Sequence, residues 1–177
     1  MVAFDDGRVQ VLRETWDTEK KRWFYHYPPG LEDERLKPDD PLHWTGRQSN
    51  WNYMCAECHV TDLKKSFDLE NDHYHMAYQE VDVGCEACHG PGSIHVDLAE
   101  SKSLFWLVQL KKEDSKVQVD MCATCHARRR RHVSAQFRPG QKLLDYLEPE
   151  ILRENLYEVD GQILDEVYVY GSYVQSR

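Results

Sequence analysis

Three short stretches of the chain combine cysteine and histidine in a spacing that can hold a cofactor. All six cysteines fall in Cys-x-x-Cys pairs, and a histidine directly follows each pair: CAECH at 55–59, CEACH at 85–89 and CATCH at 122–126. Histidine makes up 9 of the 177 residues, so chance is a poor explanation for three such placements. The repetition indicates a single chemistry that the chain uses at each motif.

Covalent haem attachment uses every feature of this motif. Two thiols separated by two residues can add across the vinyl groups at one porphyrin edge from a short helical turn, and the next residue then projects toward the iron. The sequence therefore predicts three covalent c-type haems, each with a histidine as proximal iron ligand. The attachment residues are Cys55, Cys58, Cys85, Cys88, Cys122 and Cys125, and the proximal ligands are His59, His89 and His126.

Other uses of Cys-x-x-Cys fit this pattern less well. A structural zinc site takes two pairs for its four tetrahedral ligands, and three pairs leave one unmatched. A disulfide within the motif closes a very small loop and gives the following histidine no reason to recur. A redox dithiol occurs once, near a βαβ pattern. Zinc is the main alternative to haem.

Low-spin haem irons need a second axial ligand each, and the chain has more histidines than three irons require. Met76 is the methionine that could serve instead, because Met54 and Met121 directly precede their own motifs. We expect His26 and His132 to be structural or solvated. The histidines outside the motifs are His26, His43, His73, His75, His95 and His132.

His95 follows the second motif after a Gly-Pro-Gly turn, in GCEACHGPGSIH. Six residues from His89 would have to pass around the porphyrin rim to reach the same iron, and Pro91 with Gly92 favours a tight turn instead. His95 is therefore predicted to ligate a neighbouring haem. The alternative is a surface histidine after a turn.

His43 lies twelve residues before Cys55, in the sequence DPLHWTGR. Trp44, Trp51 and Tyr53 follow it and supply flat apolar side chains of the kind that surround a haem. Pro41 favours an extended backbone before it. We predict His43 as a distal ligand, with a capping or hydrogen-bonding histidine as the alternative.

His73 and His75 occur in NDHYHMAY, separated by one residue. If this segment is extended, we expect the two imidazoles to face opposite ways, so that one of them enters a haem pocket. We favour His75 as that ligand.

Turn residues and hydrophobic alternation predict the secondary-structure elements that position these residues. Residues 1–28 predict a small β-meander with Asp6-Gly7 as a hairpin turn. We expect a mostly irregular and α-helical cytochrome core organised around three covalent haems, with the porphyrins forming much of its apolar centre. The predicted domains are a β-rich N-terminal segment (1–42), a trihaem core (43–135), and a C-terminal helix and hairpin that pack on the core (136–177).

The C-terminal third carries a basic run and two further predicted elements. The arginines at 128–131 either pair with haem propionates or an acidic partner, or form a solvated helix end that suits the helix dipole. Residues 143–157 predict a short helix interrupted by Pro149. Residues 158–174 are β-like, with an Asp-Gly turn.

Composition limits the class of protein. A net charge of -9 and a pI of about 5.4 exclude nucleic acid as an expected partner, because its phosphates would be repelled. No apolar run approaches the length of a membrane span, since the longest candidate is residues 104–110. No export signal is visible at the N-terminus.

Several of these stretches resemble a known family. HWTGRQSNWNYMCAECHVTDL, VDVGCEACHGPGSIHV and DGQILDEVYVYGSYVQSR closely resemble a multihaem c-type cytochrome domain that is often fused to tetratricopeptide repeats. That group is related to the tetrahaem cytochromes c and to the hydroxylamine oxidoreductase group. The resemblance covers nearly the whole chain, and the CHGPGxxH element is its most specific part.

The resemblance implies a setting for the chain. Members of that family carry a signal peptide, a further CxxCH before these segments and another after them, so we expect this chain to be an internal or truncated segment, or one subunit of a larger assembly. Haem is attached outside the cytoplasm, and we therefore expect a periplasmic or extracellular protein. Other redox proteins or further haem-bearing chains are the expected partners, and we leave open whether the chain oligomerises.

Electron transfer through mainly bis-histidine haems is the function these patterns favour. Closed axial positions prevent substrate from binding iron. The alternatives are a multihaem reductase or oxidoreductase of the nitrite or hydroxylamine type with one open haem, and a haem-bearing subunit of a filament or larger complex. An electron carrier is favoured over an enzyme, because no CxxCK variant is present.

Overall fold

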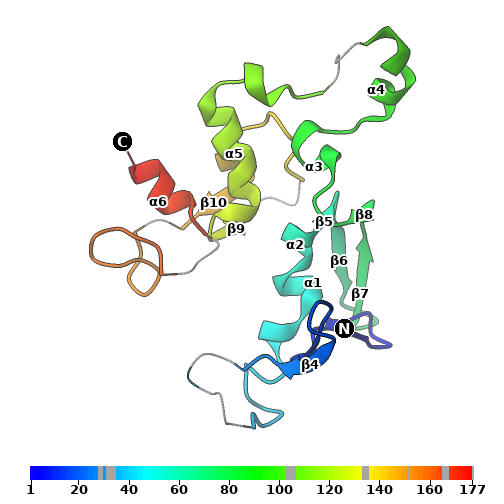
Figure 1. Cartoon of the computed structure of the whole chain (residues 1–177), viewed down its shortest axis with the longest axis vertical. Coiled ribbons are helices and arrows are strands. Elements are labelled where there is room, and N and C mark those ends of the chain that lie inside the picture. The colour runs from blue at the N-terminus through cyan, green and yellow to red at the C-terminus, as the bar shows by residue number, and fades with distance from the viewer. Residues whose placement is uncertain are drawn as a thin grey trace. The chain divides into compact units, whose positions relative to one another are not determined.

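A computed structural model describes residues 1–27, 30, 35–102, 107–132, 136–150, 152–164 and 168–176. The chain divides into two compact units, Met1–Asp82 and Val83–Arg177. Short helices and two-stranded sheets alternate with irregular segments in both units (Figure 1). The first unit holds one Cys-x-x-Cys-His motif, and the second holds the other two.

The first unit begins with two β-hairpins. Strand β1 (Val2–Ala3) pairs antiparallel with β2 (Val9–Gln10), and β3 (Glu14–Asp17) pairs with β4 (Arg22–Tyr25). The predicted turn at Asp6-Gly7 is present, with a φ of 78° at Gly7 that suits a residue lacking a side chain. The strands were predicted, but they form two separate sheets and not one meander.

The rest of the first unit carries the first motif on a helical segment followed by two strand pairs. The elements are η1 (Arg47–Ser49), α1 (Trp51–Met54), α2 (Ala56–His59), β5 (Val60–Thr61), β6 (Lys64–Asp68), β7 (His73–Ala77) and β8 (Glu80–Val81). Strand β6 pairs with β7, and β5 pairs with β8. The predicted core of loops and short helices thus contains more strand than we expected, because the residues between the motifs form hairpins.

Buried amides join the N-terminal hairpin to the helical segment. Asn52 is 2% exposed; its Oδ1 accepts from the Val9 N–H at 2.7 Å and its Nδ2 donates to the Gly7 carbonyl at 3.0 Å. Gln10 is 1% exposed, and its Nε2 donates to the carbonyls of Trp44 and Gly46. Both side chains satisfy backbone groups that would otherwise be buried without partners. The first hairpin is therefore a fixed support for the first motif.

The second unit carries the second and third motifs on helices. Its elements are α3 (Cys85–His89), α4 (Ser93–Asp97), η2 (Ala99–Ser101), η3 (Leu110–Lys112), α5 (Ser115–His126), β9 (Arg129–Arg131), η4 (Leu143–Asp145), β10 (Leu147–Pro149) and α6 (Tyr170–Gln175). Among the described elements the longest helix, α5, contacts η4 and α6, and α6 is seen beside it in Figure 1.

A small apolar core lies between α5 and the segment around η4. Ala123, Ala127, Leu143 and Leu147 are nearly fully buried. The buried carboxylate of Asp120 accepts a hydrogen bond from the backbone N–H of Leu143 at 3.3 Å. This core fixes the helix that bears the third motif.

The C-terminal prediction was partly wrong. Residues 143–157 do not form a helix interrupted by Pro149; η4 is followed by β10, which ends at Pro149 and pairs with β9. The predicted Asp-Gly turn is present at 160–161, next to a bridge between Tyr157 and Ile163. The end of the β-like stretch is instead helix α6, in which Gly171 packs closely on the ring of Tyr157 and a side chain at this position would collide with it.

Parts of two predictions lie outside the described residues. They are the first residues of the apolar run 104–110 and residues 165–167 of the C-terminal stretch. Within the described part of the chain, no helix has both the length and the apolarity required to cross a membrane.

Candidate haem-binding sites

A covalently attached haem packs on apolar side chains that the chain's own core leaves exposed.

Apolar side chains beside the first two motifs are exposed in the way such packing requires. Tyr53 and Met54, which precede Cys55, are 50% and 39% exposed. Around the second motif, Val83, Ile94 and Val96 are 52%, 44% and 70% exposed. A porphyrin attached at each motif would contact side chains of this kind.

The first motif forms one helical turn. The backbone N–H groups of Cys58 and His59 both donate to the Cys55 carbonyl at 3.1 Å. Asn50 caps the preceding helix α1 through a bond from the Tyr53 N–H to its Oδ1 at 2.9 Å. Both thiols are partly buried, and burial raises the pKa of the Cys55 thiol. This helical turn is the local structure that the sequence predicted for the motif.

The second motif forms α3, and a fixed turn follows it. Gly90, with a φ of 82°, ends the helix, and the Glu86 carboxylate accepts from the Gly92 N–H at 2.6 Å. The chain then enters α4, on which His95 is partly buried. The predicted turn is therefore present between the helices that carry His89 and His95.

The imidazole of His89 is held in the orientation of a metal ligand. Its Nδ1 lies 2.7 Å from the carbonyl oxygen of Val108, and the Val108 N–H donates to the His89 carbonyl at 3.0 Å. A carbonyl can only accept, so Nδ1 carries the proton and the lone pair of Nε2 is left for a metal. Sequence reasoning missed Val108, because a backbone carbonyl carries no residue-type signal.

The third motif occupies the last turn and a half of α5. Asp114 caps the start of this helix by accepting from the Lys116 N–H at 2.8 Å. Cys122, Cys125 and His126 lie at positions i, i+3 and i+4 and therefore share a face, whereas Ala123 is buried against the core. The motif's reactive groups thus lie on one side of a helix that the core holds in place.

The second and third motifs lie near each other within the second unit. Burial raises the pKa of the Cys88 thiol, and the neighbouring Cys122 and Cys125 raise it further. Even so, no group of three or more histidine, cysteine or acidic side chains in the described ranges is arranged to hold a metal ion. In the described residues the four thiols are thus not gathered into one tetrahedral set.

His43 lies between the N-terminal hairpins and α1. Its Nδ1 is 2.8 Å from the Thr45 hydroxyl, and its ring centroid is 6.0 Å from that of Trp44. The Thr45 backbone N–H also donates to Nδ1 at 3.3 Å, and this bond favours the tautomer with the proton on Nε2. Iron ligation through Nε2 requires the other tautomer, in which Nδ1 donates to the Thr45 hydroxyl, so the geometry fits the hydrogen-bonding alternative directly and the predicted ligand only after this change.

The expectation that His73 and His75 face opposite ways was wrong. Both lie on β7, and their ring centroids are 4.7 Å apart, because residues i and i+2 of a strand share a face. His75 is the more exposed of the two, with its Nε2 3.9 Å from an Asp68 carboxylate oxygen. The strand therefore presents two imidazoles on one face, so both of them can face a haem on that side.

Other residues named from the sequence take structural positions. The Met76 sulfur lies 2.7 Å from the Asn52 amide nitrogen. Of the basic run, Arg130 donates to Glu148 at 2.8 Å across the β9–β10 pair, and Arg128 lies over the Tyr168 ring. The run is therefore a strand with cross-strand partners, and not a solvated helix end.

Comparisons with known proteins agree with this geometry. A family model described as "Cytochrome c554 and c-prime" matches residues 14–90, a range that includes the first two motifs. A solved structure, the outer cell wall cytochrome OcwA, is similar to this one with a TM-score of 0.61 and 21% sequence identity. Both findings support a c-type cytochrome. No curated protein matches the chain.

The similarity to OcwA concerns the fold. It covers 94% of this chain but 33% of that one, so the chain spans a third of the length of the cytochrome it resembles. A c-type cytochrome implies covalent haem c with iron, which the Cys-x-x-Cys-His motifs can attach.

Proposed function

We propose that the chain is an electron-transfer cytochrome with three covalent c-type haems. Bound haem supplies a reversible one-electron couple at iron. The chain attaches the haems through thioether bonds and provides one imidazole to each iron. The thiols are Cys55 with Cys58, Cys85 with Cys88, and Cys122 with Cys125, and the proximal imidazoles belong to His59, His89 and His126.

The hydrogen bond from His89 to Val108 supports this proposal most strongly. A ligating histidine normally donates its second ring N–H to a carbonyl or carboxylate, which fixes the tautomer and raises the basicity of the ligand. The 2.7 Å bond from Nδ1 to the Val108 carbonyl has this form.

For the opposite axial positions we propose His95, His43 and His75. His95 follows a fixed turn that separates its helix from that of His89, which favours ligation to a different iron. His43 has its Nδ1 beside the Thr45 hydroxyl. His75 shares a strand face with His73, so a comparison of alanine variants at both positions is needed to tell which of them serves.

Axial ligation and the spacing of the motifs both suit an electron relay. Two imidazoles per iron close both axial positions and exclude substrate, while the second-unit motifs, which lie near each other, favour close haem packing and fast transfer. The partners we propose are other redox proteins or further haem-bearing chains. We place the protein in the periplasm or outside the cell, where c-type haem is attached.

The mass of the intact protein, produced in a host that matures c-type haem, tests the attachment. The proposal expects the mass of the chain plus three haems under denaturing conditions. Replacing both cysteines of one motif with alanine should remove the mass of one haem, and each motif should behave alike. A chain that retains three haems after such a change, or binds none, would contradict the assignment.

A further inference from the structure

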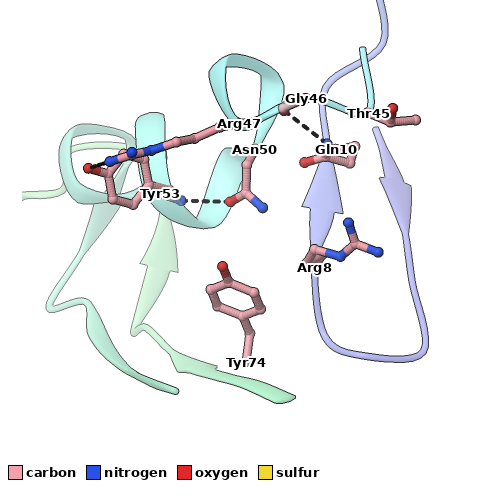
Figure 2. Close-up of a pocket in the computed structure, with 8 residues that line it drawn as sticks. All are labelled: Arg8, Gln10, Thr45, Gly46, Arg47, Asn50, Tyr53 and Tyr74. Carbon is pink, nitrogen blue, oxygen red and sulfur yellow. Dashed lines mark hydrogen bonds between the residues drawn. The ribbon is translucent and has the colours of Figure 1, made fainter. Parts of the chain in front are cut away.

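Side chains that bond backbone groups hold the helical segment before the first motif. Gln10 Nε2 donates to the Gly46 carbonyl at 3.2 Å (Figure 2). Asn50 Oδ1 accepts from the Tyr53 N–H at 2.9 Å in the same view. Both amides are buried, so the first unit fixes the approach to its motif within a packed setting.

The second unit has no such burial at α4, the helix that carries His95. None of the residues of α4 is buried. Ile94 and Val96, on either side of His95, are 44% and 70% exposed. Apolar packing by the described residues therefore does little to set the direction of this short helix, and the turn that joins it to α3 becomes decisive.

Glu86 bonds this turn with both its main chain and its side chain. Its carbonyl accepts from the Gly90 N–H at 3.0 Å, and its carboxylate accepts from the Gly92 N–H at 2.6 Å. The Gly92 carbonyl accepts in turn from the Val96 N–H at 2.9 Å. A chain of hydrogen bonds thus runs from Glu86 through Gly92 to the peptide that follows His95.

The Glu86 carboxylate also lies directly against the Gly92 backbone. A Cβ at Gly92 would be 3.3 Å from Glu86 Oε1, which is closer than ordinary van der Waals contact. A hydrogen bond to a charged acceptor is stronger than one to a neutral acceptor. Glu86 therefore favours one conformation of the turn and one direction of α4.

We infer that Glu86 is a positioning residue, which holds His95 in the direction needed to reach the iron of a neighbouring haem. This inference rests on the proposed axial role of His95. Glu86 lies between Cys85 and Cys88, so the same carboxylate connects the attachment site of one haem to the axial ligand of another. It acts through the backbone and not on iron, and no covalent or redox step is involved.

Hydrogen exchange of the haem-loaded protein, measured by mass spectrometry, tests whether Glu86 holds the turn. In Glu86→Ala the amides of residues 92–98 should exchange at least tenfold faster than in the wild type, because a charge-assisted hydrogen bond is lost. Glu86→Gln keeps an acceptor oxygen at the same reach and should retain the protection. Glu100→Ala removes an exposed glutamate of η2 and should leave this exchange unchanged. Wild-type exchange in Glu86→Ala would overturn the inference.

The ferric optical spectrum tests whether the turn positions the ligand. Glu86→Ala should show part of the high-spin signal that His95→Ala shows in full, and Glu86→Gln should keep the low-spin spectrum. A changed spectrum in His95→Ala with a wild-type one in Glu86→Ala would overturn the positioning role alone. A wild-type spectrum in His95→Ala would instead remove the proposed ligand, and the positioning role with it.

The wild type supplies a test that no folding defect of a variant can affect. The amides of Gly92 and Val96, which bond Glu86 and Gly92, should exchange at least tenfold more slowly than the same sequence in an unstructured peptide. Unprotected amides at these two positions in the haem-loaded protein would overturn the inference.

Discussion

The imidazole of His89 and the carbonyl of Val108, nineteen residues later, are joined by a hydrogen bond of 2.7 Å, and the Val108 N–H returns a bond of 3.0 Å to the His89 carbonyl. Two reciprocal bonds hold a loop residue against the histidine of the second motif. The loop therefore fixes the tautomer of His89 and would set the basicity of this proposed ligand.

Replacing Val108 by proline should raise the reduction potential of one haem. Val108→Pro removes the N–H that donates to the His89 carbonyl. The Val108 carbonyl, which accepts from His89 Nδ1, is then held less firmly. The imidazole becomes a weaker electron donor to ferric iron. The loss of about 1 kcal/mol corresponds to about 40 mV for a one-electron couple. A redox titration followed by the optical spectrum measures this shift in potential.

Val159→Pro is the matched control for that change. Val159 is fully exposed and lies inside the turn that the Gly161 N–H closes on the Glu158 carbonyl, a position that proline tolerates. All haem potentials should stay at their wild-type values in this variant. If Val108→Pro also leaves every potential unchanged, the loop does not tune His89.

Asn52→Ala should destabilise the first unit by about 2–4 kcal/mol. The change leaves the Val9 N–H and the Gly7 carbonyl without their partner in a buried place, and each such group costs about 1–3 kcal/mol. Denaturant unfolding measures the loss. Asn71→Ala, an exposed asparagine that bonds only Asp68 in the described structure, should cost less than about 0.5 kcal/mol. Equal effects of the two changes would show that Asn52 does not anchor the hairpin.

The Arg130–Glu148 pair should make stability depend on acid pH. Its hydrogen bond and charge hold the pKa of Glu148 below the ordinary value of 4.5. The pair therefore contributes stability above that value and loses it as the pH falls through the lower folded-state pKa. Unfolding midpoints at pH 7 and pH 3.5 should differ less in Glu148→Gln than in the wild type. The control Glu154→Gln, at an exposed site, should show the same difference between the two midpoints as the wild type. If Glu148→Gln also shows the wild-type difference, the Arg130–Glu148 pair does not contribute to the pH dependence.

His95→Ala should convert one haem to a high-spin form. Removing a distal imidazole leaves that iron five-coordinate or bound to a weaker ligand, which changes the ferric optical spectrum. His132→Ala is the matched control, because His132 is an exposed histidine outside the proposed ligands. A wild-type spectrum in His95→Ala would remove this residue from the ligand set.

The Cys-x-x-Cys-His motifs can be read from the sequence alone, because the proposed covalent attachment fixes residue type and spacing within five residues. The turn after His89 was also predictable, since Pro91 and Gly92 mark it locally. The support from Val108, Asn52 and Gln10 was not predictable, because backbone carbonyls and buried amides act through partners far away in sequence. The shared face of His73 and His75 could have been predicted, because residues i and i+2 of any strand point to the same side.

The optical spectrum of the reduced, haem-loaded protein with and without carbon monoxide tests the central claim most directly. Carbon monoxide binds ferrous haem at an open or weakly held axial position. An electron relay whose irons each have two histidine ligands predicts c-type bands that the gas leaves unchanged. A haem that binds carbon monoxide would contradict fully closed ligation, and turnover with nitrite or hydroxylamine at that haem would show an enzyme instead.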